Sequence, residues 1–435
     1  MTSSPHVAII GAGYAGLSAA VELTRAQVKV SVFEAATVLG GRARVAYPDG
    51  RTISNGYHQL FGAYTETLRM LRFLGVNPKT LHTRPFDLFV PERLGLSLSS
   101  LPPPLHLSLG MFGASGLGWQ DSLAAMRLYW DLRRQRYALR QDITVTQLLA
   151  DTRQTPLLKE LVWNPLCLLM LKTPAERASA QMFANMLRNT LFAGRSEAEW
   201  IVPRIDLSEL LPVPATLYLS RQGNSVHTAA PIREIQLDEG LFRLKGNASE
   251  NQLYSHVILA VAPQQAGKLL TGLEALTLLR EQIDSVPTEN MTTVYLDYGP
   301  EVSLPNPVMH LPGPPIRWLF DTARLGSSTG LVACVSIADE PRTALPDEEL
   351  ALDTHHAIER IVPRLPAPRW SHVIREDNAA FSCTPCLVRP RTITPIRNLL
   401  LAGDYVESDY PSCIEAAVRS GLAAARQLLR SLPSA

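Results

Sequence analysis

Three glycines near the start of the chain have the spacing of a dinucleotide-binding turn. The segment has the pattern Gly11-x-Gly13-x-x-Gly16 and follows a short apolar run. In such a turn the first glycine permits a tight bend, the second lets the backbone approach a pyrophosphate, and the third lets the following helix pack on the strand. That helix would begin at Tyr14 and Ala15, where free N–H groups and a positive dipole end can face phosphate oxygens. The pattern predicts a dinucleotide site, and a glycine-rich turn without a ligand is the alternative.

An acidic residue and a glycine pair extend this pattern. Glu34 follows the third glycine by 18 residues and ends a second apolar run, so its carboxylate can accept hydrogen bonds from adenosine ribose hydroxyls, beside Ala35. Gly40 and Gly41 would bring backbone close to the cofactor, and Arg42 would place a guanidinium near the pyrophosphate. NAD enzymes need no such residues at this place, so the pattern favours FAD over NAD as the cofactor. A glycine turn followed by a surface arginine is the alternative.

A second signal lies near the C-terminus. An apolar run ends in Gly403 and Asp404, and the apolar spacing over 412–429 predicts a helix that begins near Cys413 and Ile414. Asp404 can accept a hydrogen bond from a ribityl hydroxyl. The helix dipole can face the N1/C2=O edge of a flavin, where negative charge builds up on reduction. A capped terminal helix with a surface aspartate is the alternative.

Composition excludes other classes of protein. The 435 residues are 46% hydrophobic and 19% charged, and Lys+Arg 41 against Asp+Glu 40 leaves a charge of +1, which argues against nucleic-acid binding. Five unevenly spaced cysteines fit a reducing cytoplasm better than a disulfide framework. The pair Cys383 and Cys386 lacks a second pair for zinc, so we expect no metal. The N-terminus predicts no signal peptide, and no segment predicts a transmembrane helix.

Apolar patterns predict the elements that would position these residues. We expect strands at 216–220, 230–237, 241–245 and 257–262, and an amphipathic helix over 65–74. The strand at 257–262 is wholly apolar, as in a doubly wound sheet that is buried on both faces.

One segment raises the question of membrane contact. The longest stretch without Asp, Glu, Lys or Arg runs over 94–120, and its Pro, Ser and Gly residues break a spanning helix. We interpret it first as a loop that covers the core and second as a loop that dips into a bilayer surface. A helix predicted over 122–140 has an arginine-rich face, which we interpret first as solvated and second as contacting lipid headgroups.

Several short segments along the chain match one enzyme superfamily. They are 55–58, 62–64, 163–166, 172–174, 178–179, 203–210, 402–405, 411–412 and 415–421. The chain resembles the FAD-dependent amine oxidase and carotenoid desaturase superfamily nearly end to end, and within it the bacterial hydroxysqualene dehydroxylases of hopanoid biosynthesis. The segment 203–210 is the most particular to that group. Tyr57 and Tyr405 depart from the usual pattern of the hydroxysqualene dehydroxylases, which tend to have Gln and Trp at these two positions.

The resemblance implies a fold and a domain division. The fold class is α/β: an FAD-binding Rossmann-like domain of the GR2 type with an inserted mixed α+β substrate domain. We expect the FAD domain at 1–80, 205–265 and 375–435, and the substrate domain at 81–204 and 266–374, with the membrane-contact loop inside the latter.

The resemblance also suggests residues for the flavin site. His58 is the first candidate for a polar group near the flavin, as an acid or an orienting donor, and a histidine bonded to backbone is an equally good explanation. Tyr57 and Tyr405 are weaker catalytic candidates. The predicted cofactor contacts beyond those above are Gly56, Tyr57, His58, Ile232 and Ala260.

The implied reaction is reductive. Hydroxysqualene, an allylic alcohol of thirty carbons, would lose its hydroxyl group and gain hydride from reduced flavin, giving squalene. An acid must assist the departure of hydroxide, and water must be excluded from the allylic cation. The substrate needs a long apolar tunnel and comes from a membrane, so we expect a cytoplasmic protein attached peripherally to the inner face of the plasma membrane. The flavin reductant is not identified.

Three other functions remain open. A carotenoid desaturase of the phytoene type would run the flavin chemistry oxidatively on a polyene. An amine oxidase would need an aromatic cage and usually a lysine near flavin N5, and neither Lys172 nor Lys268 has a recognisable context. A lipid-binding protein with a flavin fold and no turnover is the third.

Overall fold

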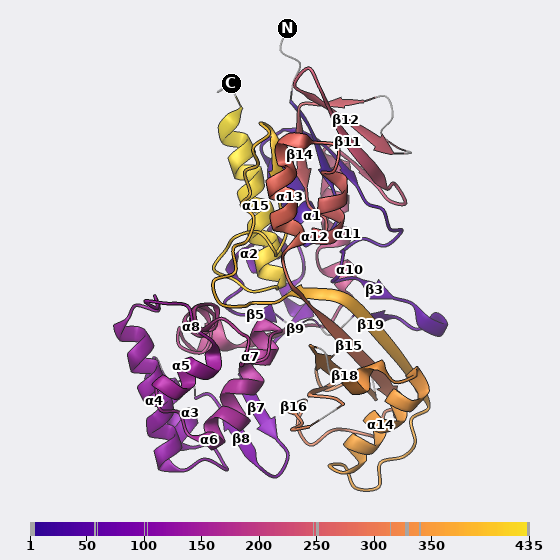
Figure 1. The fold of residues 1–435 in the computed structure, drawn as a ribbon. Helices are drawn as coiled ribbons and strands as arrows, with labels where there is room; N and C mark the ends of the chain where they lie inside the picture. Colours follow the sequence, from indigo (N-terminus) through magenta and orange to yellow (C-terminus); the bar gives the residue numbers. More distant parts are fainter. Residues whose placement is uncertain are drawn as a thin grey trace.

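The chain folds around a parallel sheet, an antiparallel sheet and a lobe of helices (Figure 1). The computed structural model describes residues 5–55, 58, 60–99, 101, 103–246, 248, 252–313, 315–326, 330–338 and 341–432. Gly56 and Tyr57 lie outside the described residues.

The parallel sheet has the strand order β10-β2-β1-β14-β20. Its strands are β1 (His6–Ile10), β2 (Lys29–Phe33), β10 (Ser225–His227), β14 (His256–Leu259) and β20 (Leu399–Leu401). Ile10 pairs with both Phe33 and Leu259, and Leu259 pairs with Leu401, so the carboxyl ends of these strands meet at one edge of the sheet. Ligands bind at this edge in open α/β sheets.

Two long helices cover this sheet. Helix α1 (Tyr14–Arg25) is buried except at Arg25, and α15 (Ile414–Ser431) packs directly on it. A Cβ atom at Gly421 would lie 2.0 Å from the carbonyl oxygen of Ala15, so only glycine permits this close approach. The first turn of α15 also holds α2 (Thr65–Phe73), because buried Glu415 accepts hydrogen bonds from the backbone N–H and hydroxyl of Thr67.

One predicted strand is wrong. Residues 216–220 belong to helix α11 (Pro212–Arg221), which packs on α1. Pro212 stands in the first turn, where its fixed φ favours a helix. Ala215 and Leu219 are buried at helical spacing, whereas a strand would alternate.

The predicted strands that follow α11 are confirmed in a small sheet of order β11-β12-β13 and in β14. This sheet contains β11 (Ile232–Asp238), β12 (Leu241–Gly246) and β13 (Leu253–Tyr254). Helices α12 (Pro263–Leu269) and α13 (Thr277–Asp284) pack on each other beside it (Figure 1).

The antiparallel sheet has the order β16-β17-β18-β15-β19. Its strands are β15 (Thr288–Asp297), β16 (Val308–His310), β17 (Trp318–Asp321), β18 (Leu331–Ile337) and β19 (Trp370–Phe381). Helix α14 (Asp347–Glu359) packs against β15 and β19. Within this sheet, the long strands β15 and β19 extend toward the parallel sheet (Figure 1).

The helical lobe lies beside this sheet (Figure 1). Its helices are α3 (Leu105–Phe112), α4 (Trp119–Arg134), α5 (Val145–Asp151), α6 (Pro156–Leu158), α7 (Asn164–Leu171) and α8 (Ala180–Asn189). Short elements join the parts: β3 (Val45–Ala46), β4 (Ile53–Ser54), β5 (Leu60–Phe61), β6 (Leu81–Arg84), β7 (Asp87–Val90), β8 (Leu94–Ser97), α9 (Arg195–Ala198), β9 (Trp200–Pro203) and α10 (Leu207–Leu210). The stretch 94–120 is not one loop, since it contains β8 and α3.

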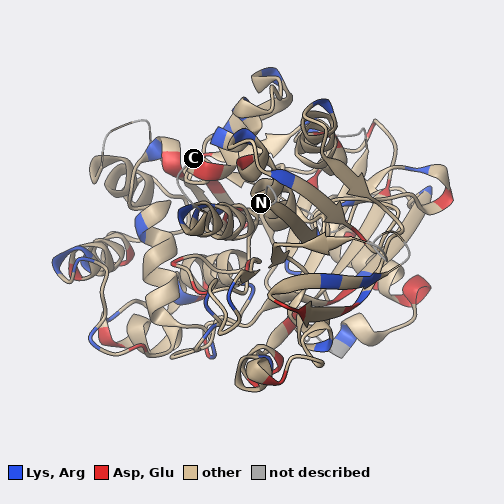
Figure 2. Cartoon of the chain, turned by 90° about the horizontal axis from the view of Figure 1, so that it is seen from above, with Lys and Arg blue, Asp and Glu red and all other residues tan. Residues whose placement is uncertain are grey.

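The surface carries mixed charge. Figure 2 shows basic and acidic residues interspersed over the molecule rather than gathered on one face. Among the described residues, no helix combines the length and the apolar character needed to cross a membrane. The division into an FAD domain and a substrate domain stays a prediction.

Candidate active site

A cavity of about 550 Å³ opens at the carboxyl edge of the parallel sheet and extends to the antiparallel sheet. This volume is in the usual range for small-molecule sites. The predicted site residues that line it are Gly11, Gly13, Tyr14, Ala15, Glu34, Ala35, Gly40, Gly41, Arg42, His58, Ile232, Ala260, Gly403, Asp404, Cys413 and Ile414. Gly16 and Tyr405 do not line it, and the structure does not describe Gly56 and Tyr57.

The three glycines of the turn differ in what they face. Gly11 has φ +101°, and a Cβ there would lie 2.5 Å from the carbonyl oxygen of Ala260. A Cβ on Gly16 would lie 2.0 Å from the carbonyl oxygen of Gly11. A Cβ on Gly13 would lie 3.8 Å from the Cα of Gly41, which is an ordinary contact distance, so packing does not require a glycine here, and Gly13 lines the cavity at the N-terminus of α1. Two glycines therefore serve the packing of the protein, and the third leaves room for a ligand.

The carboxylate of Glu34 is held in place by the backbone. Its Oε2 accepts a hydrogen bond from the N–H of Ala12 at 2.8 Å, and its Oε1 accepts one from Ala36 at 2.9 Å. Each oxygen retains a further lone pair. Glu34 lines the cavity, so these lone pairs can accept ribose hydroxyls, as the sequence predicts.

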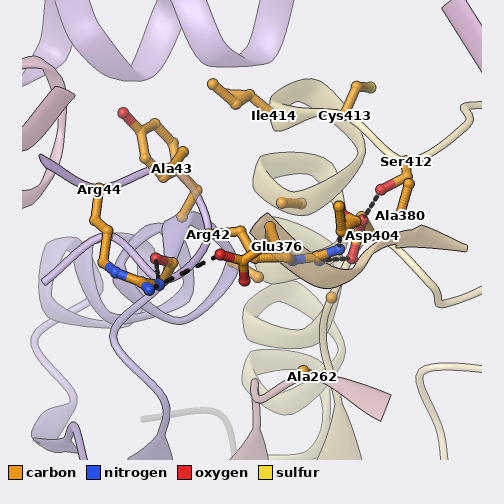
Figure 3. Close-up of a pocket in the computed structure, with 18 of the residues that line it drawn as sticks. Arg42, Ala43, Arg44, Ala262, Glu376, Ala380, Asp404, Ser412, Cys413 and Ile414 are labelled. Carbon is orange, nitrogen blue, oxygen red and sulfur yellow. Dashed lines mark hydrogen bonds and ion pairs between the residues drawn. The ribbon is translucent and has the colours of Figure 1, made fainter. Parts of the chain in front are cut away.

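Arg42 reaches across the cavity to the C-terminal segment. Its Nη2 donates to Asp404, its Nη1 donates to the carbonyl of Ala379 at 2.8 Å, and Ser412 donates to the other oxygen of Asp404 (Figure 3). Burial acts to lower the pKa of Arg42, but attraction to Asp404 outweighs it and raises that pKa. The predicted pyrophosphate partner and the predicted ribityl partner are thus one ion pair.

His58 is neutral near pH 7. Burial lowers its pKa to about 4, and nearby cationic Lys172 and Arg42 act in the same direction. Its Nε2 lies 2.9 Å from the carbonyl oxygen of Asn55, so this nitrogen carries the hydrogen and donates a hydrogen bond to the backbone. The arrangement matches the alternative of a backbone-bound histidine and does not supply an acid.

Tyr405 lies behind the wall of the cavity. Its ring packs on Gly403, where a Cβ would come within 2.6 Å of Cε1. The hydroxyl has no hydrogen-bond partner among the described residues, and burial raises its pKa.

Lys172 lines the same cavity and was not among the predicted site residues. It ends α7 in a left-handed conformation with φ 59°, and its Nζ donates to the carbonyl of Leu169. Burial lowers its pKa to about 8. Its charge also acts on His58, so the two side chains belong to the same part of the site. Lys172 begins the matching segment 172–174, but neither that match nor the local sequence predicts its burial beside His58.

The antiparallel sheet supplies an apolar wall. Met291, Trp318, Phe320, Val335 and Ile337 line the cavity from three neighbouring strands. The indole Nε1 of Trp318 is buried and has no hydrogen-bond partner among the described residues. An unpaired buried N–H is unfavourable by about 1–3 kcal/mol, so this donor at the cavity wall is free to bond a polar atom that comes within reach.

Two carboxylates also face the cavity. Glu376 accepts a hydrogen bond from the amide of Asn55 at 2.8 Å and lies 3.9 Å from Arg44 (Figure 3). Glu289 is buried, accepts a hydrogen bond from Ser382 and pairs with Arg177 at 3.2 Å. Within the described ranges, no three His, Cys, Asp or Glu side chains are grouped as metal ligands.

Comparison with known proteins gives consistent matches. The profile of the family described as "Flavin containing amine oxidoreductase" matches residues 14–429. A hydroxysqualene dehydroxylase of Rhodopseudomonas palustris is 30% identical over 98% of this chain and 99% of its own length. One of Sinorhizobium fredii is 28% identical over 97% of each. An oxidoreductase from Methanosarcina mazei shares the fold, with a TM-score of 0.75, 16% identity and coverage of 97% of this chain and 100% of that structure.

Proposed function

The chain belongs to the family of flavin containing amine oxidoreductases, and from this premise we propose that it binds FAD and converts hydroxysqualene to squalene. The predicted resemblance to the hydroxysqualene dehydroxylases is confirmed, and the chain is a flavin-dependent oxidoreductase. The observation that carries the proposal is one cavity that joins a dinucleotide edge to an apolar wall and that a buried lysine also lines.

The adenosine half of the cavity supports FAD as the flavin. The cavity surface at Gly13 fits a pyrophosphate at the N-terminus of a helix of 12 residues, and the cavity-lining carboxylate of Glu34 fits the ribose. The residues proposed to hold the flavin half are Asp404 for the ribityl chain and the N-terminus of α15 at Cys413 and Ile414 for the ring. Bound and reduced, this flavin supplies the hydride.

The apolar wall supports an isoprenoid substrate. A simple amine would leave Met291, Phe320, Val335 and Ile337 exposed to water, whereas each methylene buried there contributes about 0.8 kcal/mol. The same wall excludes water from the carbon that loses its oxygen, which protects an allylic cation from recapture.

We propose Lys172 as the proton donor. An acid that works near neutral pH needs a pKa close to that pH, and the value of about 8 meets this condition better than the value of about 4 for His58. The C–O bond breaks as the oxygen takes the proton and leaves as water. The amine left on Lys172 then regains a proton from solvent.

The indole of Trp318 is proposed to hold the oxygen of the substrate. Trp318 lines the cavity and its Nε1–H is unpaired, so a small rotation of the buried indole would let it donate one hydrogen bond within an otherwise apolar wall. That bond would orient the hydroxyl and assist its departure without adding water to the site.

The proposal includes a cellular setting. The reaction would belong to hopanoid and squalene biosynthesis, and an unidentified donor must reduce the flavin again after each turnover. A cytoplasmic protein attached peripherally to the inner face of the plasma membrane fits a substrate of thirty carbons.

A single turnover tests this function. The purified enzyme is reduced without oxygen and mixed with hydroxysqualene, the flavin absorbance is followed, and the extracted lipid is identified. We expect flavin reoxidation with formation of squalene. Recovery of the alcohol with the flavin still reduced would contradict the proposal. Conjugated double bonds formed from phytoene would then favour a desaturase, and peroxide released with simple amines would favour an amine oxidase.

A further inference from the structure

Six large apolar side chains are exposed on two neighbouring helices of the helical lobe. They are Leu105, Leu109 and Phe112 on α3 and Trp119, Leu123 and Trp130 on α4, each between 48% and 66% exposed. Their spacing places each set on one side of its helix. We call these six residues the α3–α4 face. Clusters of exposed apolar residues mark interaction sites more often than scattered ones.

The α3–α4 face is accompanied by basic residues. Arg127 and Arg134 continue the exposed stripe of α4, since they follow Leu123 by 4 and 11 residues. Arg133 in the last turn of α4 is also exposed, as are Arg136 and Arg140 just after the helix. Among the described residues, no ion pair joins these five arginines to a carboxylate. The stripe is therefore both apolar and cationic.

The carboxylates of the same helix do not cancel this charge. Asp121 is buried and used within the lobe, where it accepts hydrogen bonds from the N–H of Gly118 and the hydroxyl of Thr155. Asp131 is the other acidic residue of α4, and one carboxylate against five arginines leaves the surface in positive excess. A surface with bulky apolar groups, tryptophans and unpaired arginines complements the interface of an anionic bilayer, where indoles sit at headgroup level and arginines meet phosphates.

We propose that α3 and α4 dock the protein on an anionic phospholipid membrane. The choice of a membrane over a second copy of the chain rests in part on the proposed function, because a water-insoluble isoprenoid must be taken from a bilayer. The two helices lie at the outer end of the helical lobe, far from the parallel sheet (Figure 1). Docking there leaves the dinucleotide edge away from the membrane.

Buried polar contacts connect the docking helices to the cavity. The amide of Gln154 donates to the carbonyl of Ala124 in α4 at 2.7 Å and accepts a hydrogen bond from the indole of Trp163 at 2.8 Å. Helix α7 begins at the next residue, and its Leu169 and Met170 line the cavity. The lobe that meets the membrane is therefore the lobe that forms one wall of the substrate site.

Vesicle cosedimentation tests the docking surface without any turnover. The holoprotein is mixed with vesicles of phosphatidylcholine alone or with added phosphatidylglycerol. We expect binding that increases with phosphatidylglycerol and falls with salt. The variant Trp119→Ser/Leu123→Ser/Trp130→Ser should bind at least about tenfold more weakly to both vesicles. The variant Arg127→Gln/Arg134→Gln should lose about 25-fold on anionic vesicles alone, at about fivefold per arginine.

A matched variant controls for loss of exposed apolar surface. Leu278 and Leu352 are 81% and 53% exposed on α13 and α14, so Leu278→Ser/Leu352→Ser should bind vesicles like the wild type. Flavin absorbance shows that each variant is folded. Equal binding by the triple serine variant and the wild type would overturn the proposal. So would absence of vesicle binding together with a wild-type dimer that the triple variant loses, because the face would then be a contact between copies.

Failure of docking and failure of the proposed function are distinguishable. If the function holds and docking does not, hydroxysqualene in detergent is still converted and vesicles are not bound. If docking holds and the function does not, vesicles are bound and the alcohol is recovered unchanged.

Discussion

The two walls of the cavity are built from different kinds of contact. The wall of the parallel sheet relies largely on backbone: glycines, helix N-termini, and the carboxylate of Glu34 held by N–H groups. The opposite wall relies on side chains, with an apolar surface and an unpaired indole N–H, and helix α7 adds a lysine to the cavity. A backbone wall fits one rigid ligand. A wall of side chains selects a substrate by apolar area and by a few polar atoms.

The largest effect should come from closing the backbone wall. Gly13→Val adds a side chain at the cavity surface, at a position with an ordinary φ of −76° where the added Cβ makes no contact shorter than 3.8 Å, so the protein should fold but lose its flavin. Flavin absorbance and circular dichroism of the purified variant check this. Gly272→Ala is the matched control, since no atom lies within 4 Å of the added Cβ there. A Gly13→Val protein with full flavin content would show that this part of the cavity is not the cofactor site.

Removing the proposed acid should preserve the flavin and slow the chemistry. Lys172→Met is expected to lower the single-turnover rate about 10²–10⁴-fold, which is the usual contribution of a general acid. In the wild type the donor is protonated below its pKa of about 8, so the rate should fall as pH rises through 8. Lys268→Met, away from this cavity, serves as the control. An unchanged rate in Lys172→Met would remove Lys172 from the mechanism.

The third effect is one of stability. The folded pKa of His58 is lowered from 6.5 to about 4, so the unfolded chain binds a proton more readily as pH falls below 6.5. Its contribution to the free energy of unfolding is complete above pH 6.5 and should decline by about 2 kcal/mol at pH 5. Urea unfolding of the wild type and His58→Gln at pH 8 and pH 5 measures this difference. Equal pH dependence in both proteins would show that His58 titrates normally.

The smallest effect concerns the unpaired indole. Trp318→Phe keeps the apolar wall and removes the N–H, so the single-turnover rate should fall about tenfold, equivalent to ~1.4 kcal/mol. The free energy of unfolding should change little, because removal of the buried unpaired donor offsets part of the cost of the cavity that the smaller ring leaves. The two readouts separate a ligand contact from a structural one. A destabilised variant with an unchanged rate would assign Trp318 to packing alone.

The backbone wall was accessible from sequence because its residues lie close together in the chain or at strand ends. Gly11, Gly13, Glu34 and Arg42 fall within one strand–helix–strand unit, and a strand followed by a helix identified Asp404. Spacing alone could not reveal that Arg42 pairs with Asp404, because 362 residues separate them.

The wall of side chains was not accessible in the same way. Lys172, Trp318 and Glu376 come from α7, β17 and β19, and only the fold brings them to one cavity. Residues 216–220 show the same limit on a local scale, since Pro212 and the burial of one helical face decide against a strand. The resemblance gave the reaction class, whereas the candidate acid required the burial of Lys172.

A single turnover in D₂O would test the central claim most directly. The N5–H of a reduced flavin exchanges with solvent, so hydride transfer should place one deuterium on the carbon that lost oxygen, while the proton from Lys172 leaves in water. The account predicts squalene with one deuterium at that carbon, formed as the flavin is reoxidised. Unlabelled squalene, or reoxidised flavin with the alcohol intact, would contradict it.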